Sequence, residues 1–315
     1  MTENNAPSQL VQPAVQGTIL EVRHLPSREG QELHTNIVLK GHPLPTSWRS
    51  SDLHHTENPE LHWNPEVCIY CQQCDRVCPK GCLHQGDEGL EIDHECCDTC
   101  GECLKECPST ALQMIGIRTT AGDLLHKTLK QNYSTARKIT RISITGGEPG
   151  SQTAFVAELL FQIEQAGIPA ILETSGLAPF ENLLPLLSRP VQIRFELITP
   201  DEQAHLHLTG YGNSLILENL VQIADELSPP TTLVVRTPLI RNQTATRAAL
   251  AYTGEWLSTH LDTRCHRWEW FEPQSTCLEL DDFSNQEWAQ MKTWAAEINF
   301  PFENIGLVDR YRHRR

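Results

Sequence analysis

The chain has 315 residues, of which 39% are hydrophobic and 21% are charged, as in many globular proteins. Its formal net charge of −15 repels phosphate groups, which excludes nucleic acid and anionic membranes as main partners. The chain holds no apolar run of about 18 residues, so we expect no membrane span. Its polar first segment is unlike a secretion signal, so we expect a cytoplasmic protein with residues 1–16 as a disordered tail.

Strand-like and helical patterns alternate on both sides of a cysteine-rich segment. The strand-like runs cover Gly17–Val22, Asn36–Lys40, Ile139–Thr145, Ala170–Thr174, Gln192–Ile198, Thr232–Val235 and Arg267–Phe271. The helical patterns cover Ala121–Gln131, Ser151–Ala166, Pro179–Leu187, Ser214–Leu227, Thr244–His260 and Asn285–Ile298. Such alternation with short connections indicates parallel strands joined by crossover helices.

We therefore predict an α/β fold, in which residues 17–64 and 113–315 form a partial β/α (TIM-like) barrel. An open, doubly wound sheet is the alternative. In the barrel, functional residues are expected at the C-terminal ends of the strands.

Ten of the twelve cysteines lie between Cys68 and Cys107. There the spacing C-x2-C-x2-C-x3-C-P occurs twice, from Cys68 and again from Cys97. In ferredoxins with this spacing, the first three thiolates of a repeat hold one 4Fe-4S cluster and the fourth reaches the other cluster. We accordingly predict that residues 65–112 form a ferredoxin-like insert with two 4Fe-4S clusters. One cluster is assigned to Cys68, Cys71, Cys74 and Cys107, and the second to Cys97, Cys100, Cys103 and Cys78.

The rival interpretations of these cysteines explain less of the pattern. Zinc takes four ligands from paired C-x2-C knuckles and gives no reason for the third and fourth cysteines of each repeat. Unligated buried thiols would not need the spacing at all. Cys82 and Cys96 are left over, and we interpret them as packing or auxiliary thiols. No role is predicted for Cys265 and Cys277.

A second motif, Gly146-Gly147-Glu148-Pro149, lies between a predicted strand and a predicted helix. Two glycines let a ligand approach the backbone, and a helix N-terminus favours a carboxylate or phosphate. Glu148 could pair with an ammonium group. Arg236, on a later strand, is a second candidate ligand contact, with a structural ion pair as its alternative. A plain structural turn fits the glycine motif equally well.

In their order, these features resemble the glycyl-radical-enzyme activating proteins of the radical S-adenosylmethionine superfamily, specifically the subtype with a two-cluster ferredoxin insert. The resemblance covers residues 17–307. Its motifs are Gly17-Thr18-Ile19-Leu20, Lys40-Gly41-x-Pro43-Leu44, the insert, Gly146–Pro149, Leu172–Gly176, His207–Gly210 and Arg236–Arg241. It implies a partial barrel whose Gly-Gly-Glu segment binds the methionine end of S-adenosylmethionine.

The chain departs from the family pattern where the family holds its radical-generating cluster. The family's C-x3-C-x2-C is replaced by His42, Thr46 and Arg49. A cubane takes soft anionic or imidazole ligands, which neither a hydroxyl nor a permanent cation supplies. Further departures are Glu29–His34 for Asp-Gly-Pro-Gly-Ile-Arg, Glu196–Ile198 for Asp-x-Lys, and Glu272–Gln274 where the family has tyrosine and histidine.

Three hypotheses follow. In the first, the chain keeps the barrel and the two clusters, lacks the radical cluster and has no catalytic residue. It would then carry single electrons or dock on a partner, which would be a glycyl radical enzyme, an activase or a flavodoxin- or ferredoxin-type electron donor. In the second, it is a working activase with unusual cluster ligands, such as His42 with His54, His55 or His62. In the third, the barrel belongs to a different enzyme and binds another small molecule at Gly146–Glu148.

Overall fold

The computed structural model describes residues 14–26, 32–42, 44, 56–87, 89–135, 138–273, 283–298 and 305–308. Within them, a nine-stranded mixed sheet has the strand order β13-β12-β11-β10-β9-β8-β2-β1-β7. Neighbouring strands from β2 to β13 are parallel, whereas β1 is antiparallel to both β2 and β7. The strands are β1 (Gln16–Pro26), β2 (Glu32–Leu39), β7 (Ile117–Thr120), β8 (Lys138–Gly146), β9 (Ala170–Thr174), β10 (Val191–Glu196), β11 (Thr232–Pro238), β12 (Arg267–Phe271) and β13 (Ile305–Val308).

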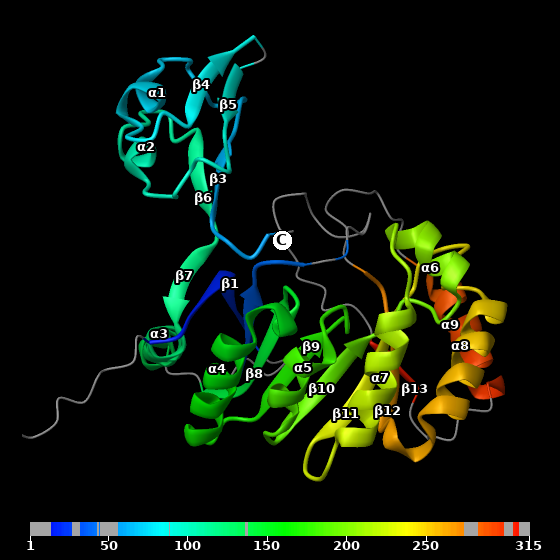
Figure 1. Ribbon diagram of the computed structural model, residues 1–315. Helices are drawn as coiled ribbons and strands as arrows, with labels where there is room; N and C mark the ends of the chain where they lie inside the picture. The colour runs from blue at the N-terminus through cyan, green and yellow to red at the C-terminus, as the bar shows by residue number, and fades with distance from the viewer. Residues whose placement is uncertain are drawn as a thin grey trace, which may run out of the picture.

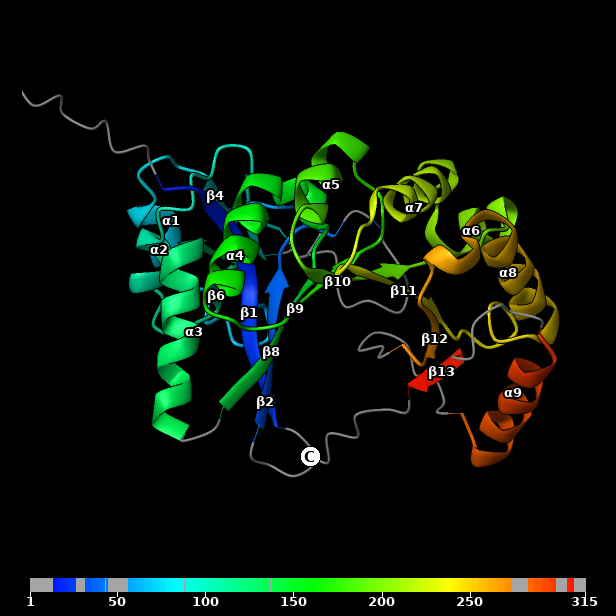
Figure 2. The ribbon, with the colours of Figure 1, turned by 90° about the horizontal axis from the view of Figure 1, so that it is seen from below.

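From β9 to β13, each strand lies beside the strand that precedes it in the chain, and β8 lies beside β2. A doubly wound sheet reverses its strand order part of the way across its parallel strands, whereas the described parallel strands run in one order and only the antiparallel edge strand β7 departs from it. The helices follow the sheet along one side, as Figure 2 shows. They are α3 (Ala121–Thr135), α4 (Thr153–Gln165), α5 (Phe180–Leu187), α6 (Glu202–Thr209), α7 (Ser214–Glu226), α8 (Arg247–His260) and α9 (Asn285–Glu297).

The apolar periodicity of the sequence explains how helices and strands pack. The helical period of the sequence places Phe155, Leu159, Leu160 and Ile163 on one face of α4, and these four residues are at most 1% exposed. The helix ends at Gln165, and Gly167 follows at φ 66°. A left-handed residue of this kind is the usual way for the chain to turn away from a helix.

Strand β10 alternates strictly between buried and partly buried residues. Val191, Ile193 and Phe195 belong to the apolar core, whereas Arg194 and Glu196 belong to the other face of the sheet. This second face is polar near the C-terminal ends of the strands. The sheet therefore separates a helix-covered core from a polar concave side.

A separate lobe projects from the β7 end of the sheet (Figure 1). It begins with β3 and ends with β6, slightly outside the predicted boundaries of 65–112, because these two strands pair antiparallel at its base. A small core formed by Leu61, Leu83, Cys103 and Leu112 lies between its elements. These are β3 (Glu60–Trp63), α1 (Gln73–Val77), β4 (Leu83–Gly86), β5 (Gly89–Ile92), α2 (Glu102–Lys105) and β6 (Leu112–Ile115).

Candidate functional site

The first group of cysteines surrounds a cavity of about 370 Å³ in the lobe. Cys68, Cys71, Cys74 and Cys107 all line it, together with apolar residues that include Trp63 and Leu112. Burial raises the pKa of the Cys74 thiol. The structure thus places Cys107 in the same cavity wall as the three cysteines of the other repeat.

The second group surrounds a separate cavity of about 340 Å³. Its cysteines are Cys78, Cys97, Cys100 and Cys103. Burial, reinforced by the neighbouring Cys97 and Cys100, raises the pKa of the Cys103 thiol to about 11. A thiol of this kind gives up its proton to a metal rather than to water at neutral pH, so cluster assembly here would release protons.

The two cysteine repeats share the same backbone turns. Tyr70 and Thr99, each two residues after the first cysteine of its repeat, have φ near 55° and 58°. Gln72 and Gly101, two residues further on, are also left-handed and precede the short helices α1 and α2. A left-handed conformation is unfavourable for a β-branched residue such as Thr99. The repeat therefore keeps a costly turn that wraps the chain around a cavity and points the Tyr70 amide at Cys68 Sγ, 3.4 Å away.

The two lobe cavities fit a multi-iron cluster in the kind and number of their donors. Each offers four thiols distributed around its wall, and ferredoxin clusters take one thiolate per iron. In the part of the chain that the structure describes, no three His, Cys, Asp or Glu side chains converge in the way a single metal ion requires.

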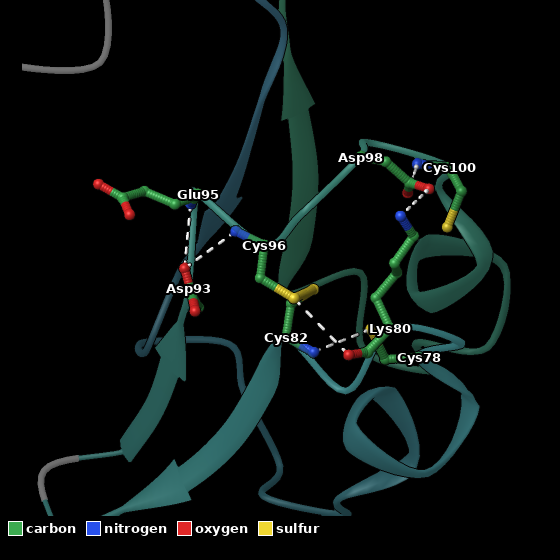
Figure 3. Close-up of a disulfide and its surroundings, with 8 residues drawn as sticks. All are labelled: Cys78, Lys80, Cys82, Asp93, Glu95, Cys96, Asp98 and Cys100. Carbon is green, nitrogen blue, oxygen red and sulfur yellow. Dashed lines mark hydrogen bonds and ion pairs between the residues drawn. A yellow bond between two sulfur atoms is a disulfide. The ribbon is translucent and has the colours of Figure 1, made fainter.

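The structure corrects the interpretation of Cys82 and Cys96, which form a disulfide and are not packing thiols (Figure 3). The hairpin of β4 and β5 brings together two residues that are 14 apart in the chain, with a Cα–Cα distance of 5.6 Å. Cys265 is a buried free thiol two residues before β12, and burial raises its pKa to about 11. Cys277 lies outside the described residues.

A third cavity, of about 370 Å³, lies at the C-terminal ends of β8 to β11. Two carboxylates and two guanidinium groups line it, which makes it polar and close to neutral in net charge. Its described lining residues are His42, Gly146, Gly147, Glu173, Thr174, Ser175, Arg194, Glu196 and Arg236. Sequence reasoning found Gly146, Gly147 and Arg236, but it gave Glu173 no role within the Leu172–Gly176 motif and missed Arg194, whose signal was the polar alternation along β10.

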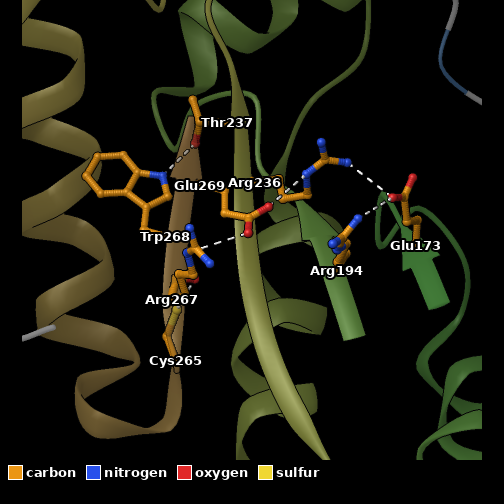
Figure 4. Close-up of polar contacts among 8 residues, drawn as sticks. All are labelled: Glu173, Arg194, Arg236, Thr237, Cys265, Arg267, Trp268 and Glu269. Atoms are coloured by element: carbon orange, nitrogen blue, oxygen red, sulfur yellow. Dashed lines mark hydrogen bonds and ion pairs between the residues drawn. The ribbon is translucent and has the colours of Figure 1, made fainter. Parts of the chain in front are cut away.

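Ion pairs join the polar side chains across neighbouring strands (Figure 4). Arg236 Nη1 lies 3.2 Å from Glu173 Oε1, and Arg194 Nη1 lies 3.5 Å from the same oxygen. On its other side, Arg236 Nε lies 3.5 Å from Glu269 Oε2, and its guanidinium stacks 4.3 Å from the centre of the Phe271 ring. Arg236 therefore makes the structural ion pairs that were the alternative to ligand contact, while it still lines the cavity.

Close packing against the backbone of residues 39–41 explains why glycine occupies positions 146 and 147. A Cβ on Gly147 would lie 2.5 Å from the carbonyl oxygen of Lys40, and Gly146 has φ +90°. The close approach allows Gly147 N to donate to Leu39 O and Glu148 N to donate to Gly41 O, each at 2.9 Å. The glycines thus join the end of β8 to the Lys40–Gly41 turn, a requirement that holds with or without a ligand.

Glu148, which the sequence made a candidate partner for an ammonium group, is buried and is not among the described residues that line the cavity. Its carboxylate accepts hydrogen bonds from Thr174 Oγ1 at 2.5 Å, Ser175 N at 2.9 Å and Ser175 Oγ at 2.7 Å. Burial raises the pKa of this carboxyl. Its observed contacts tie the end of β8 to the end of β9.

Of the histidines proposed as substitute ligands, the two that the structure describes belong to different parts of the molecule. His42 lines the third cavity, whereas His62 lies on β3 of the lobe. Thr46, Arg49, His54 and His55 lie outside the described residues, as do Glu29–Gln31 and Gln274.

Three comparisons place the chain among known proteins. A family model described as a 4Fe-4S binding domain matches residues 61–84, in the first half of the lobe. The isethionate sulfite-lyase activating enzyme of Oleidesulfovibrio alaskensis is 30% identical over 229 residues, which cover 71% of this chain and 74% of that enzyme. The (2S)-3-sulfopropanediol dehydratase activating enzyme of Klebsiella oxytoca is 26% identical over 250 residues, with 78% of each chain covered.

A solved structure shows the same fold. The radical SAM methyltransferase from Sphaerobacter thermophilus superimposes with a TM-score of 0.53 over 93% of this chain and 78% of its own, at 12% identity. Fold and lobe together define an iron–sulfur protein built on the radical S-adenosylmethionine fold. Within that class, the chain belongs to the family of glycyl-radical-enzyme activating enzymes. None of the helices in the described ranges has the length and apolarity needed to cross a membrane.

Proposed function

We propose that this chain carries two 4Fe-4S clusters, relays single electrons and does not itself cleave S-adenosylmethionine. The observation that carries the proposal is the pair of lobe cavities, each lined by four thiols drawn from both repeats. One cluster would be held by Cys68, Cys71, Cys74 and Cys107, and the other by Cys97, Cys100, Cys103 and Cys78. When bound, such clusters accept and donate electrons one at a time.

The residues of the lobe suit this role. The small core of Leu61, Leu83 and Leu112 keeps water away from the inner walls of both cavities. Backbone amides point at the sulfur atoms, with Tyr70 N donating to Cys68 Sγ and Cys82 N donating to Cys78 Sγ at 3.3 Å. Such hydrogen bonds stabilise the added negative charge of a reduced cluster.

The cavity at the sheet edge supports the second half of the proposal. The described residues that line it include no cysteine, and His42 stands where the family's cysteine triad begins. If S-adenosylmethionine binds, Gly146, Gly147 and Arg236 would contact it. We place that cavity in a partial barrel that lacks the third cluster, so S-adenosylmethionine would be a ligand without being cleaved.

The partner class follows from the relatives, whose names describe enzymes that activate isethionate sulfite-lyase and (2S)-3-sulfopropanediol dehydratase. For this chain we propose a glycyl radical enzyme or its working activase as the partner, with a flavodoxin- or ferredoxin-type protein as electron donor. The retained sheet would supply the docking surface.

The test is the iron and acid-labile sulfide content per chain after anaerobic reconstitution, together with an assay for 5′-deoxyadenosine under dithionite. We expect about eight irons, bleaching by dithionite and no 5′-deoxyadenosine. Cys74→Ser and Cys103→Ser should each retain about four irons. Cys265→Ser is the matched control, since this buried thiol lines neither lobe cavity. About twelve irons with 5′-deoxyadenosine formed would show a working activase and refute the proposal.

A further inference from the structure

We propose that Cys82 and Cys96 form a redox-active pair that takes up two electrons through the ligands of the second cluster. This inference rests on the second cluster proposed above. It concerns two cysteines that neither cysteine repeat uses.

The first argument is the position of the pair beside two cluster ligands. Cys82 lines the same cavity as Cys78, Cys97, Cys100 and Cys103. Its backbone N–H donates to Cys78 Sγ at 3.3 Å, as Figure 3 shows. Cys96 directly precedes the ligand Cys97 in the chain, so a peptide bond joins the two residues. Each sulfur of the pair thus has a short covalent or hydrogen-bonded path to a different ligand of one cluster.

The second argument is that local hydrogen bonds fix both cysteines. Asp93 Oδ1 accepts from the backbone N–H groups of Glu95 and Cys96, both at 3.0 Å. Asp93 N donates to Cys82 O at 2.9 Å, and Cys97 N donates to Asp93 O at 3.0 Å. These contacts fix Cys96 and the ligand Cys97 in one turn and hold that turn against Cys82. The two thiols produced by reduction would therefore stay close enough to reform the disulfide.

The third argument is the asymmetry of exposure. Cys82 is 1% exposed, whereas Cys96 is partly exposed, with its Sγ 3.6 Å from the Lys80 carbonyl oxygen. In redox-active pairs, access and the attacked sulfur decide the rate of exchange. Cys96 is the sulfur that protons or an external thiol can reach, and Cys82 is the one that faces the cluster cavity.

The chemistry balances with the electron donor already named. A flavodoxin- or ferredoxin-type donor delivers two electrons, one at a time, by way of Cys78 and Cys97. The Sγ–Sγ bond breaks, two protons enter from solvent on the Cys96 side, and two thiols form. The transfer requires a cluster whose reduction potential is lower than that of the disulfide, as the low-potential clusters of the ferredoxin type provide. The pair would convert a one-electron supply into a two-electron store.

The test is an anaerobic reductive titration of the reconstituted, air-oxidised protein with reduced methyl viologen. We expect about four electron equivalents per chain, one for each cluster and two for the disulfide. The Cys82→Ser/Cys96→Ser double variant should take up about two. Cys265→Ser, which leaves the pair intact, should match the wild type. In parallel, maleimide labelling read by mass spectrometry should find Cys82 and Cys96 blocked before the titration and labelled after it.

The outcomes separate this inference from the proposed function. About eight irons, equal electron uptake by wild type and double variant, and a disulfide that stays closed would overturn the redox role and leave the two clusters standing. Free Cys82 and Cys96 thiols in the oxidised protein would overturn it as well. About four irons in the wild type, with the second cluster missing, would overturn both proposals.

Discussion

Replacing Glu148 by alanine tests whether the Gly-Gly-Glu segment holds the sheet together. The carboxylate is 1% exposed and accepts from Thr174 Oγ1, Ser175 N and Ser175 Oγ. Without it, the two hydroxyls can turn toward other acceptors, but the Ser175 N–H cannot. Thr174 Oγ1 also accepts from Gly176 N at 3.0 Å, so the loss extends into the turn after β9.

The expected size of the effect follows from these contacts. A hydrogen bond to a charged acceptor contributes about 1.5–3 kcal/mol, and a buried donor left without an acceptor costs about 1–3 kcal/mol. Part of this loss is offset because the variant no longer buries a carboxylate, the same desolvation that raises the pKa of Glu148. We expect a net loss of about 2–4 kcal/mol of local stability at the end of β9.

Hydrogen exchange read by mass spectrometry measures this loss directly. Peptides that cover β9 and the following turn should exchange about 30- to 1,000-fold faster in Glu148→Ala, because about 1.4 kcal/mol corresponds to a factor of ten. Glu181→Ala, an exposed residue in the first turn of α5, should leave these rates unchanged. Unchanged exchange in Glu148→Ala would refute the structural role and return this residue to the list of ligand contacts.

Three further predictions address other parts of the chain. Gly147→Ala forces a Cβ against the backbone of Lys40, so it should lower the free energy of unfolding by about 2–4 kcal/mol in urea titrations. Gly122→Ala, with its nearest contact at 3.7 Å, should cost nothing; equal effects would contradict the packing argument. Burial, with Arg141 and Arg194 adding to it, lowers the pKa of His34 to about 4 in the folded chain. The unfolded chain therefore binds more protons between pH 6.5 and 4, and stability falls as the pH drops through that window. Because His34 is only half-buried, we expect the free energy of unfolding to fall by about 0.5–1 kcal/mol between pH 7.5 and 5.5. This loss should be absent in His34→Gln, and an equal loss in that variant would exclude His34 as the cause. Finally, Cys78→Ala should expose the remaining cysteines of the second group to alkylation, and Cys107→Ala should expose those of the first group. Mass spectrometry identifies the alkylated cysteines. The reverse outcome would show that each repeat holds its own cluster.

The features predictable from the sequence are those set by residues close together in the chain. The apolar face of α4 follows from the helical period over thirteen residues, and the structure buries it. The division of the cysteines between two cavities follows from the repeated spacing, since the turns between the cysteines are local and alike in both repeats. In each case, residues that are close together in the sequence determine the local structure.

The features that were not predictable depend on which distant residues face each other. The ion pairs of Glu173, Arg194 and Arg236 need the register of β9, β10 and β11, which brings residues from three strands to one face. The disulfide of Cys82 and Cys96 needs the β4–β5 hairpin. The short strands β7 and β13 have weak patterns of their own, and pairing with β1 and β12 stabilises them.

The way the lobe joins the sheet has a consequence for the history of such chains. The lobe enters on β3 and leaves on β6, where Glu60 is paired directly with Ile115, so its two ends lie side by side. The buried Lys40 amino group holds Glu60 Oε2 at 2.8 Å and fixes the point of entry. A segment with adjacent ends can be gained or removed in a single recombination event without changing the order of the strands around it. Lobe and sheet are therefore free to diverge independently, and a chain of this architecture can lose the chemistry of one part while selection preserves the other.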